Sequence, residues 1–355
     1  MNIFDIPLDV LKEIFELSDF ITKIRFRRIC KYSYKNLHIM DFSNIEEKYL
    51  ERLTEDILKK HKFIKYLNAK NNPNIKDINW MINLKELNAS GTCGIDENGI
   101  RKLDLIKLDI NNNNKIKNVG WMKNLKELDA CGKSVDQSGI NGLNLIKLNA
   151  YNNSKIKHVN WMINLKELDA GGECGIDQEG IKELNLIKLD IWDNKKIKDL
   201  SFMMSLKELY IYADGSCKID QNGIKGLNLT KLVVNNYSKI TDVSWMTNLK
   251  ELSVSGACGI DQSGIKGLNL IILDAGNNSK IKDVSFMTNL KQLYASGTSG
   301  IDQNGIKGLN LISLNVNFNP KIKDISFMKN LKELDAFGTF LKGIERLNLV
   351  TLNVI

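Results

Sequence analysis

The chain contains 355 residues, of which 43% are hydrophobic and 26% charged, and it carries a net charge of +8 at pH 7. No apolar run reaches the roughly 18 residues that a membrane-spanning helix needs. The first residues show no basic stretch followed by an apolar core, so a secretory signal is not expected. We therefore predict a protein without a membrane interaction that stays in the cytoplasm, with the nucleus as the alternative compartment.

Charge pattern and cysteine content argue against a nucleic-acid-binding protein and against a protein held together by zinc or disulfides. The basic residues are almost all lysines spread evenly along the chain, which indicates a solvated surface rather than a nucleic-acid interface. The six cysteines include no C-x-x-C pair, so neither a zinc site nor a disulfide framework is expected. Five of them recur at about the spacing of a repeat, where we expect them to fill small apolar slots: Cys93, Cys131, Cys174, Cys217 and Cys258.

Residues 1–38 form the first predicted domain, a small all-α module. A proline followed by apolar residues at helical spacing predicts a first helix, whose apolar side carries Val10, Leu11, Ile14 and Phe15. Asp19 stands where it can cap a second helix. That second helix contains the arginine cluster Arg25, Arg27 and Arg28.

This module resembles an F-box. The matching residues are the opening Ile6-Pro7-Leu8, the pair Ile14-Phe15 and the basic stretch that ends in Cys30-Lys31, while Ser33 stands where the family pattern has Trp. The resemblance implies that the module binds a Skp-type adaptor and a cullin of an SCF ubiquitin ligase. It assigns the apolar contacts to Ile6, Pro7, Leu8, Leu11, Ile14 and Phe15. The alternative is a helical cap that shields the first repeat.

Residues 39–63 are predicted to be a helical linker or cap between the module and the repeats. Ser43 and Glu46 stand at the spacing of a capping box. Apolar residues accompany this signature at Ile45, Tyr49, Leu53, Ile57 and Leu58. We therefore expect a helix in this segment.

The third predicted domain, residues 64–355, is an array of repeats. An aromatic residue followed by Met recurs every 40 to 43 residues, at Trp80, Trp121, Trp161, Phe202, Trp245, Phe286 and Phe327. Between successive pairs lie two similar stretches, called coils here, which both fit the leucine-rich-repeat pattern L-x-x-L-x-L-x-x-N/C. Fourteen coils and a partial one beginning at Leu349 follow each other. Positions are numbered from the first leucine of each coil, which is position 0, so that Lys107 stands at +2 of the coil that begins at Leu105.

The leucine spacing predicts the architecture. The L-x-L alternation puts both leucines on one face of a short strand, and stacked coils bury that face together. Coils of about 20–21 residues leave little room for a return helix. We predict an α/β repeat solenoid: a leucine-rich-repeat horseshoe with short parallel strands and little convex helix, preceded by the small all-α module.

Two polar rows are expected to support the coils. Asparagines at the ladder position should satisfy buried backbone groups of neighbouring coils: Asn72, Asn113, Asn153, Asn194, Asn278 and Asn319. Aspartates of the second halves stand where they would cap a helical turn: Asp96, Asp136, Asp177, Asp220, Asp261 and Asp302. Tyr237 replaces one ladder asparagine. Both rows are interpreted as structural rather than catalytic.

The concave face is expected to be internally paired and otherwise negative. Position +2 alternates in charge through Glu86, Lys107, Glu127, Lys147, Glu167, Lys188, Glu208, Lys231 and Glu251. Position +4 is acidic at Asp109, Asp129, Asp169, Asp190, Asp274 and Asp335. Because phosphates would be repelled there, no nucleic-acid partner is expected.

Aromatic residues interrupt the uniform concave face. Tyr151, Trp192 and Tyr212 stand at +6 of their coils and Tyr210 at +4, and two extra residues lie within 213–217. Exposed aromatics on a rigid surface are typical binding anchors. We predict that a protein target binds here, through Tyr151, Trp192, Tyr210, Tyr212, Asp169 and Asp190. Further candidates are Tyr294 and Phe337, and sequence drift in the array is the alternative.

The combination of this module with these repeats resembles F-box/leucine-rich-repeat proteins, in particular those of giant viruses that infect amoebae. The resemblance implies a substrate-recruiting adaptor without an active site, in the host cytoplasm if the protein is viral. Only three histidines occur (His38, His61 and His158), in no recognisable constellation, and no phosphate loop or nucleophile elbow is present. We expect no enzyme, cofactor or metal. The alternative is an interaction scaffold whose N-terminal helices only cap the solenoid.

Overall fold

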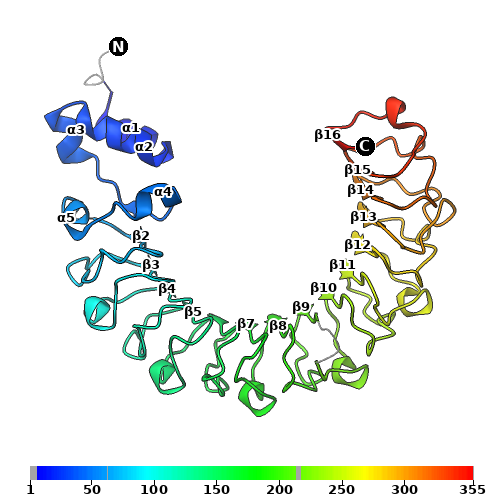
Figure 1. The fold of residues 1–355 in the computed structure, drawn as a ribbon, viewed down its shortest axis with the longest axis horizontal. Helices are drawn as coiled ribbons and strands as arrows, with labels where there is room; N and C mark the ends of the chain where they lie inside the picture. Colours follow the sequence, from blue (N-terminus) through cyan, green and yellow to red (C-terminus); the bar gives the residue numbers. More distant parts are fainter. Residues whose placement is uncertain (1–5, 62, 213–216, 355) are drawn as a thin grey trace. The chain divides into compact units, whose positions relative to one another are not determined.

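The structure, a computed structural model, describes residues 6–61, 63–212 and 217–354. The extra residues predicted within 213–217 fall outside these ranges except for Cys217. Two compact units are present, a first unit of Met1–Lys157 and a second unit of His158–Ile355. In Figure 1 the strands of each unit lie side by side along one face, and loops with short helical turns form the opposite face.

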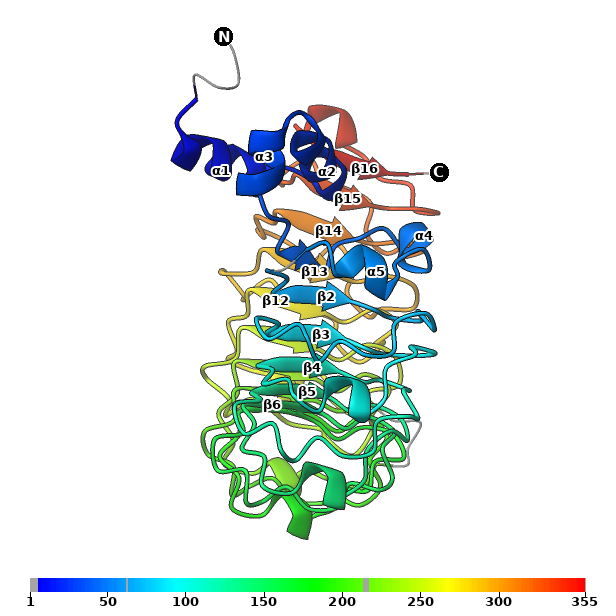
Figure 2. The same ribbon diagram turned by 90° about the vertical axis from the view of Figure 1, so that its left-hand side faces the viewer.

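The first unit starts with helices and continues as a stack of short strands. The helices are α1 (Leu8–Leu17), α2 (Phe20–Arg28), α3 (Lys31–Asn36), α4 (Glu47–Leu50) and α5 (Glu55–Leu58). The strands are parallel and neighbour each other in chain order, as Figure 2 shows for β2 to β6. They are β1 (Asp41–Phe42), β2 (Tyr66–Asn68), β3 (Glu86–Asn88), β4 (Lys107–Asp109), β5 (Glu127–Asp129) and β6 (Lys147–Asn149). The 3₁₀ turns are η2 (Asn98–Ile100) and η3 (Ser138–Ile140).

The segment 39–63, predicted to be helical, also contains a strand. β1 pairs in parallel with β2, so the sheet begins before the predicted start of the repeats at Ile64. The predicted capping box is wrong: the Ser43 hydroxyl bonds to Asp41 at 2.5 Å, and α4 has no side-chain cap. The side chain of Thr54 instead caps α5, because its hydroxyl oxygen accepts the backbone N–H of Ile57 at 3.4 Å.

The second unit consists of parallel strands in chain order with intervening 3₁₀ turns. The strands are β7 (Glu167–Asp169), β8 (Lys188–Asp190), β9 (Glu208–Tyr210), β10 (Lys231–Val233), β11 (Glu251–Ser253), β12 (Ile272–Asp274), β13 (Gln292–Tyr294), β14 (Ser313–Asn315), β15 (Glu333–Asp335) and β16 (Thr351–Asn353). The turns are η4 (Glu179–Ile181), η5 (Asn222–Ile224), η6 (Ser263–Ile265) and η7 (Ile344–Arg346). The predicted leucine-rich-repeat solenoid with little convex helix is confirmed.

The core of each unit is a stack of identical apolar positions. In β4 the middle residue Leu108 is fully buried while its neighbours on the strand face outward, and β12 repeats this pattern around Leu273. Each strand lies in register with the next, so leucine packs on leucine through the stack. A single coil could not bury this face, which explains why the repeats are stable only as an array.

Aspartates start the helical turns of the second halves, as predicted. The carboxylate of Asp177 accepts the backbone N–H of Gly180 at 3.0 Å, and Asp302 accepts that of Gly305 at 3.1 Å. The turn after Asp177 is the 3₁₀ helix η4, the tight form used for short helical segments.

The asparagine ladder is confirmed and explains how the coils stay together. The buried amide of Asn113 donates hydrogen bonds to the carbonyls of Ala89 at 2.7 Å and Ile95 at 3.2 Å, both in the preceding coil. Asn278 does the same to Val254 and Ile260 at 2.8 and 3.2 Å. Each amide therefore satisfies carbonyls that strand pairing leaves without a partner.

Tyr237 performs the ladder function with a phenol. Its side chain is buried, and its hydroxyl donates to the carbonyls of Cys217, at 3.2 Å, and Ile219. Burial raises the pKa of this hydroxyl above its ordinary value, so it remains a donor. Tyr237 is therefore part of the core and does not belong to the exposed aromatics of the concave face.

Four of the five repeat cysteines occupy the predicted buried slots: Cys93, Cys174, Cys217 and Cys258. Burial raises the pKa of Cys93 and Cys174 to about 11, which keeps these thiols protonated. The prediction was wrong for Cys131, which is half-buried just after β5. In that coil the buried slot holds Ser134.

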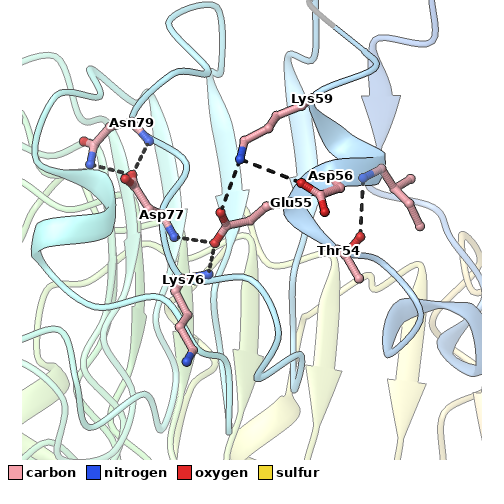
Figure 3. A network of polar contacts seen from close by, with 8 residues as sticks. Thr54, Glu55, Asp56, Lys59, Lys76, Asp77 and Asn79 are labelled. Atoms are coloured by element: carbon pink, nitrogen blue, oxygen red, sulfur yellow. Dashed lines mark hydrogen bonds and ion pairs between the residues drawn. The ribbon is translucent and has the colours of Figure 1, made fainter.

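A second row of polar contacts runs between the outer loops. Gln178 accepts the backbone N–H groups of Lys198 and Asp199 with one oxygen, both at 3.0 Å. In the first unit Glu55 makes the same bonds to Lys76 and Asp77, also at 3.0 Å (Figure 3). The N–H groups of Asp77 and Lys76 hold the pKa of Glu55 below its ordinary value. Glu55 thus joins α5 to the first full coil.

We predict that Glu55→Ala lowers the free energy of unfolding of the first unit by about 1 kcal/mol, because two backbone donors lose their acceptor. Glu55→Gln should retain stability, since Gln178 shows that an amide oxygen accepts both bonds. Urea denaturation followed by circular dichroism measures both variants. Equal destabilisation by Ala and Gln would contradict this role.

We also predict that Tyr237→Phe lowers the free energy of unfolding by about 1–3 kcal/mol, because the buried carbonyl of Ile219 loses its phenol donor, whereas that of Cys217 still accepts from Lys239. Tyr294→Phe is the matched control, since Tyr294 lies partly exposed on β13 and holds no ladder position. Thermal and urea unfolding compare the two. If both variants are as stable as the unmodified protein, the phenol is not a ladder donor.

Candidate interaction surfaces

Helix α1 has an inner side and an open side. Leu11 and Phe15 are 2% and 1% exposed, and the Phe15 ring packs edge-on against Phe26 with centroids 6.4 Å apart. On the other side Val10, Ile14 and Leu17 follow each other at helical spacing, and Leu17 is 85% exposed. The described module therefore presents an apolar stripe (Val10, Ile14 and Leu17), called the α1 stripe below.

The six residues assigned by the F-box resemblance lie in different environments. Leu11 and Phe15 belong to the core of the module, and Ile6 and Leu8 are half-buried. Only Pro7 and Ile14 are exposed. Their role in adaptor binding stays a prediction. Sequence reasoning placed Val10 on the apolar side but gave no role to Leu17, although its spacing from Ile14 is helical.

Ser33 stands in the last helix of the module. It replaces the Trp of the family pattern and is buried in α3, where its hydroxyl donates to the carbonyl of Cys30 at 3.2 Å. The sulfur of Cys30 in turn caps α3 by accepting the N–H of Ser33 at 3.4 Å. Cys30 and Ser33 therefore fix the start of α3 through local hydrogen bonds.

A buried polar contact holds the module to the segment that follows it. The guanidinium of Arg27 donates to Nδ1 of His61 at 2.8 Å and lies over the ring of Tyr34. The imidazole of His61 packs on Phe42 of β1, with ring centroids 5.0 Å apart. Burial, followed by the charge of Arg27, lowers the pKa of His61 from 6.5 to about 4. The neutral imidazole is therefore the form that accepts the arginine.

Charged pairs cover part of the concave face, as predicted for position +2. Lys107 pairs with Glu127 at 3.3 Å, Lys188 with Glu208 at 3.7 Å, and Lys231 with Glu251 at 2.7 Å. Because these side chains are partly exposed, each pair contributes little stability. Their effect is to neutralise the middle of the face.

The acidic residues at +4 end the strands. Asp190 accepts the backbone N–H of Trp192 at 2.9 Å, and Asp169 accepts that of Gly171 at 3.0 Å. The two residues face each other on the neighbouring strands β7 and β8. Burial raises the pKa of Asp190, as it does for Asp109 and Asp129. These carboxylates therefore shape the turn that carries the aromatics, in addition to their predicted role in target binding.

Three of the four predicted aromatic anchors lie on neighbouring coils of the second unit. Trp192 and Tyr212 are 43% and 40% exposed and stack edge-on, with centroids 5.3 Å apart. Tyr210 is half-buried, donates to Glu208 at 3.0 Å and lies between the ammonium groups of Lys188 and Lys231. The fourth, Tyr151, is half-buried just after β6 of the first unit.

The described residues offer no other obvious chemistry. Among them no group of three or more His, Cys, Asp or Glu side chains is arranged to hold a metal ion. In the same ranges, every helix is too short or too polar to cross a membrane. A hollow of about 430 Å³ lies beside α1 and is lined by Lys12, Phe15, Glu16, Lys35, Asn36, Leu37, His38, Met40 and Phe63.

Comparison with solved structures finds distant matches. A leucine-rich-repeat protein of Leptospira interrogans is 16% identical, with a TM-score of 0.38 over 88% of this chain and 93% of the other. A structure of the yeast complex of Rad7 and Elc1 is 16% identical, with a TM-score of 0.47 over 96% of this chain and 94% of the other. The functional domain of InlJ from Listeria monocytogenes, which includes a cysteine ladder, is 19% identical, with a TM-score of 0.36 over 72% of this chain and 68% of the other. At such identities the likeness concerns the fold alone.

No protein-family model matches the sequence, and no curated protein matches it. The class of this protein therefore follows from its own geometry: it is a leucine-rich-repeat solenoid with a small N-terminal helical module.

We predict that the protein loses stability as the pH falls from about 6.5 to about 4. In this window the unfolded chain binds a proton at His61 and the folded chain does not, so acid favours unfolding. His61→Gln, which does not titrate, should flatten this dependence. Urea unfolding at several pH values measures the slope. An unchanged slope in His61→Gln would sink this assignment.

Proposed function

We propose that the protein is a non-catalytic, substrate-recruiting adaptor of an SCF-type ubiquitin ligase. The N-terminal module binds a Skp-type adaptor and thereby a cullin, and the concave repeat face binds a protein target. The site of action is the cytoplasm, that of the host if the protein is viral, or the nucleus.

The observation that carries this proposal is the α1 stripe. A module of three short helices has few apolar residues to spare, yet Ile14 and Leu17 point away from its core. Exposed apolar side chains at helical spacing fit the groove of a partner protein. The F-box resemblance of the same helix supplies the identity of that partner.

The competing function is an interaction scaffold whose helices only cap the solenoid. A cap needs one apolar face, directed at the coil it covers. Helix α1 has buried Leu11 and Phe15 and still carries the α1 stripe on another side. A cap alone gives no reason for that second face, which favours the adaptor over the scaffold.

The test is calorimetric binding of a purified Skp-type adaptor to the full chain. We predict that Ile14→Asp combined with Leu17→Asp weakens binding at least about tenfold, because two apolar contacts are replaced by charges. Both positions are exposed, so the fold should persist, whereas the buried Phe15 is unsuitable for this experiment.

Ile82→Asp is the matched control, since Ile82 is an equally exposed apolar residue outside the module. It should leave binding unchanged. If the unmodified chain does not bind the adaptor, or the double variant binds as tightly, the helices are a cap and the protein is a scaffold.

A further inference from the structure

One edge of the second unit concentrates acids and aromatics. We call the residues at +4, +6 and +7, where each strand ends and turns, the exit rim. In the coils that begin at Leu165 through Leu331 these positions, without residue 213, which lies outside the described ranges, contain no Lys or Arg. Their charged residues are Asp169, Asp190, Asp193, Asp274 and Asp335. The exit rim is therefore negative although the whole chain is positive.

Phe318 breaks a rule that the other first-half coils obey. At +7 their backbone is left-handed, and the residue is Asn or Asp in each case: Asn71, Asn112, Asn152, Asp193, Asn236 and Asn277. Phe318 holds the same conformation with φ 54°. Small polar side chains adopt this conformation at low cost, whereas an aromatic side chain is strained in it. Stability alone therefore does not explain the choice of Phe.

The surroundings hold Phe318 in place and leave it open to a partner. Its ring is 60% exposed and stacks edge-on against Phe337, with centroids 5.3 Å apart. Beneath it lies Gly338, where a Cβ atom would come within 2.6 Å of the ring. The N–H of Phe318 donates to the carbonyl of Phe337 at 2.8 Å. The pair is thus prearranged rather than loosely placed.

This pair repeats the geometry of Trp192 and Tyr212. Both pairs have centroids 5.3 Å apart, with interplanar angles of 73° and 74°. Both lie on the exit rim, and six strand spacings of about 4.8 Å put them roughly 29 Å apart along the sheet. Two similar sites on one rim suit an extended segment better than a small molecule.

The chemistry of the rim selects a cation. Aromatic faces attract ammonium and guanidinium groups, and neighbouring carboxylates add to that attraction. Tyr210 on the same face shows the preference within the protein, since two lysine ammonium groups lie 5.1 and 5.7 Å from its ring.

We propose that the exit rim of the second unit binds an extended, arginine- or lysine-rich segment of the target, with Trp192–Tyr212 and Phe318–Phe337 as its two anchor points. This deepens the target-binding half of the proposed function and rests on it. The basic side chains stack on the ring pairs, and the rim aspartates keep acidic segments away.

The test uses the purified full chain without any Skp-type adaptor. A fluorescent peptide of alternating arginine and glycine, long enough to span about 29 Å when extended, is titrated and its anisotropy recorded. We expect Phe318→Asn to weaken binding about threefold to thirtyfold while raising the unfolding midpoint, because Asn suits the left-handed backbone. Trp192→Ala with Tyr212→Ala should weaken binding similarly.

Phe286→Ser, which removes an exposed ring outside the exit rim, is the control and should change nothing in binding. Unchanged affinity in Phe318→Asn, or binding of an acidic peptide or duplex DNA in preference to the basic one, would overturn the proposal. Adaptor binding by the module is unaffected in either case, so this result and that of the α1 stripe are independent.

Discussion

The fold depends on a buried side-chain donor that recurs in every second coil and bonds to carbonyls of the coil before it. Strands of three residues leave most of each coil without regular pairing partners, and the ladder side chain supplies them. Asn153 reaches two carbonyls of the coil before it, at 2.9 and 3.1 Å, and Tyr237 shows that the position demands a donor rather than an amide. When such a donor is lost, buried carbonyls remain without a hydrogen-bond partner. The contact between two neighbouring coils is then weakened.

Because the buried ladder side chains and leucines stabilise the coils, the exposed strand positions can vary without loss of the fold. The rows at +2 and +4 show two ways of using that freedom. Lys231 and Glu251 pair and cancel, whereas Asp190 and Trp192 form a turn that presents an aromatic ring. Local substitutions can thus change the binding surface without changing the solenoid, which is why such arrays accommodate many partners.

The periodic features of the fold could be predicted from the sequence, whereas features that occur at a single position could not. The strands, the ladder and the capping aspartates follow from periodic positions, and all were predicted. The orientation of α1 was not, since Leu11 and Ile14 look alike in sequence and only tertiary packing separates them. Phe318 was missed for another reason. Its significance lies in a backbone conformation that becomes visible only when φ is measured.

Net charge is a poor guide to the chemistry of such a surface. The overall value of +8 would repel a basic segment if the charge were shared evenly. Across each strand the charge is not shared evenly: lysines at +1 such as Lys250 and Lys291 stand at the end opposite the rim aspartates, while Lys188 and Lys231 at +2 lie beside Tyr210. With a Debye length of about 8 Å at physiological salt, a ligand on the exit rim responds mainly to its near neighbours. Under our proposal, the segregation of charge across each short strand selects the segment that the exit rim binds.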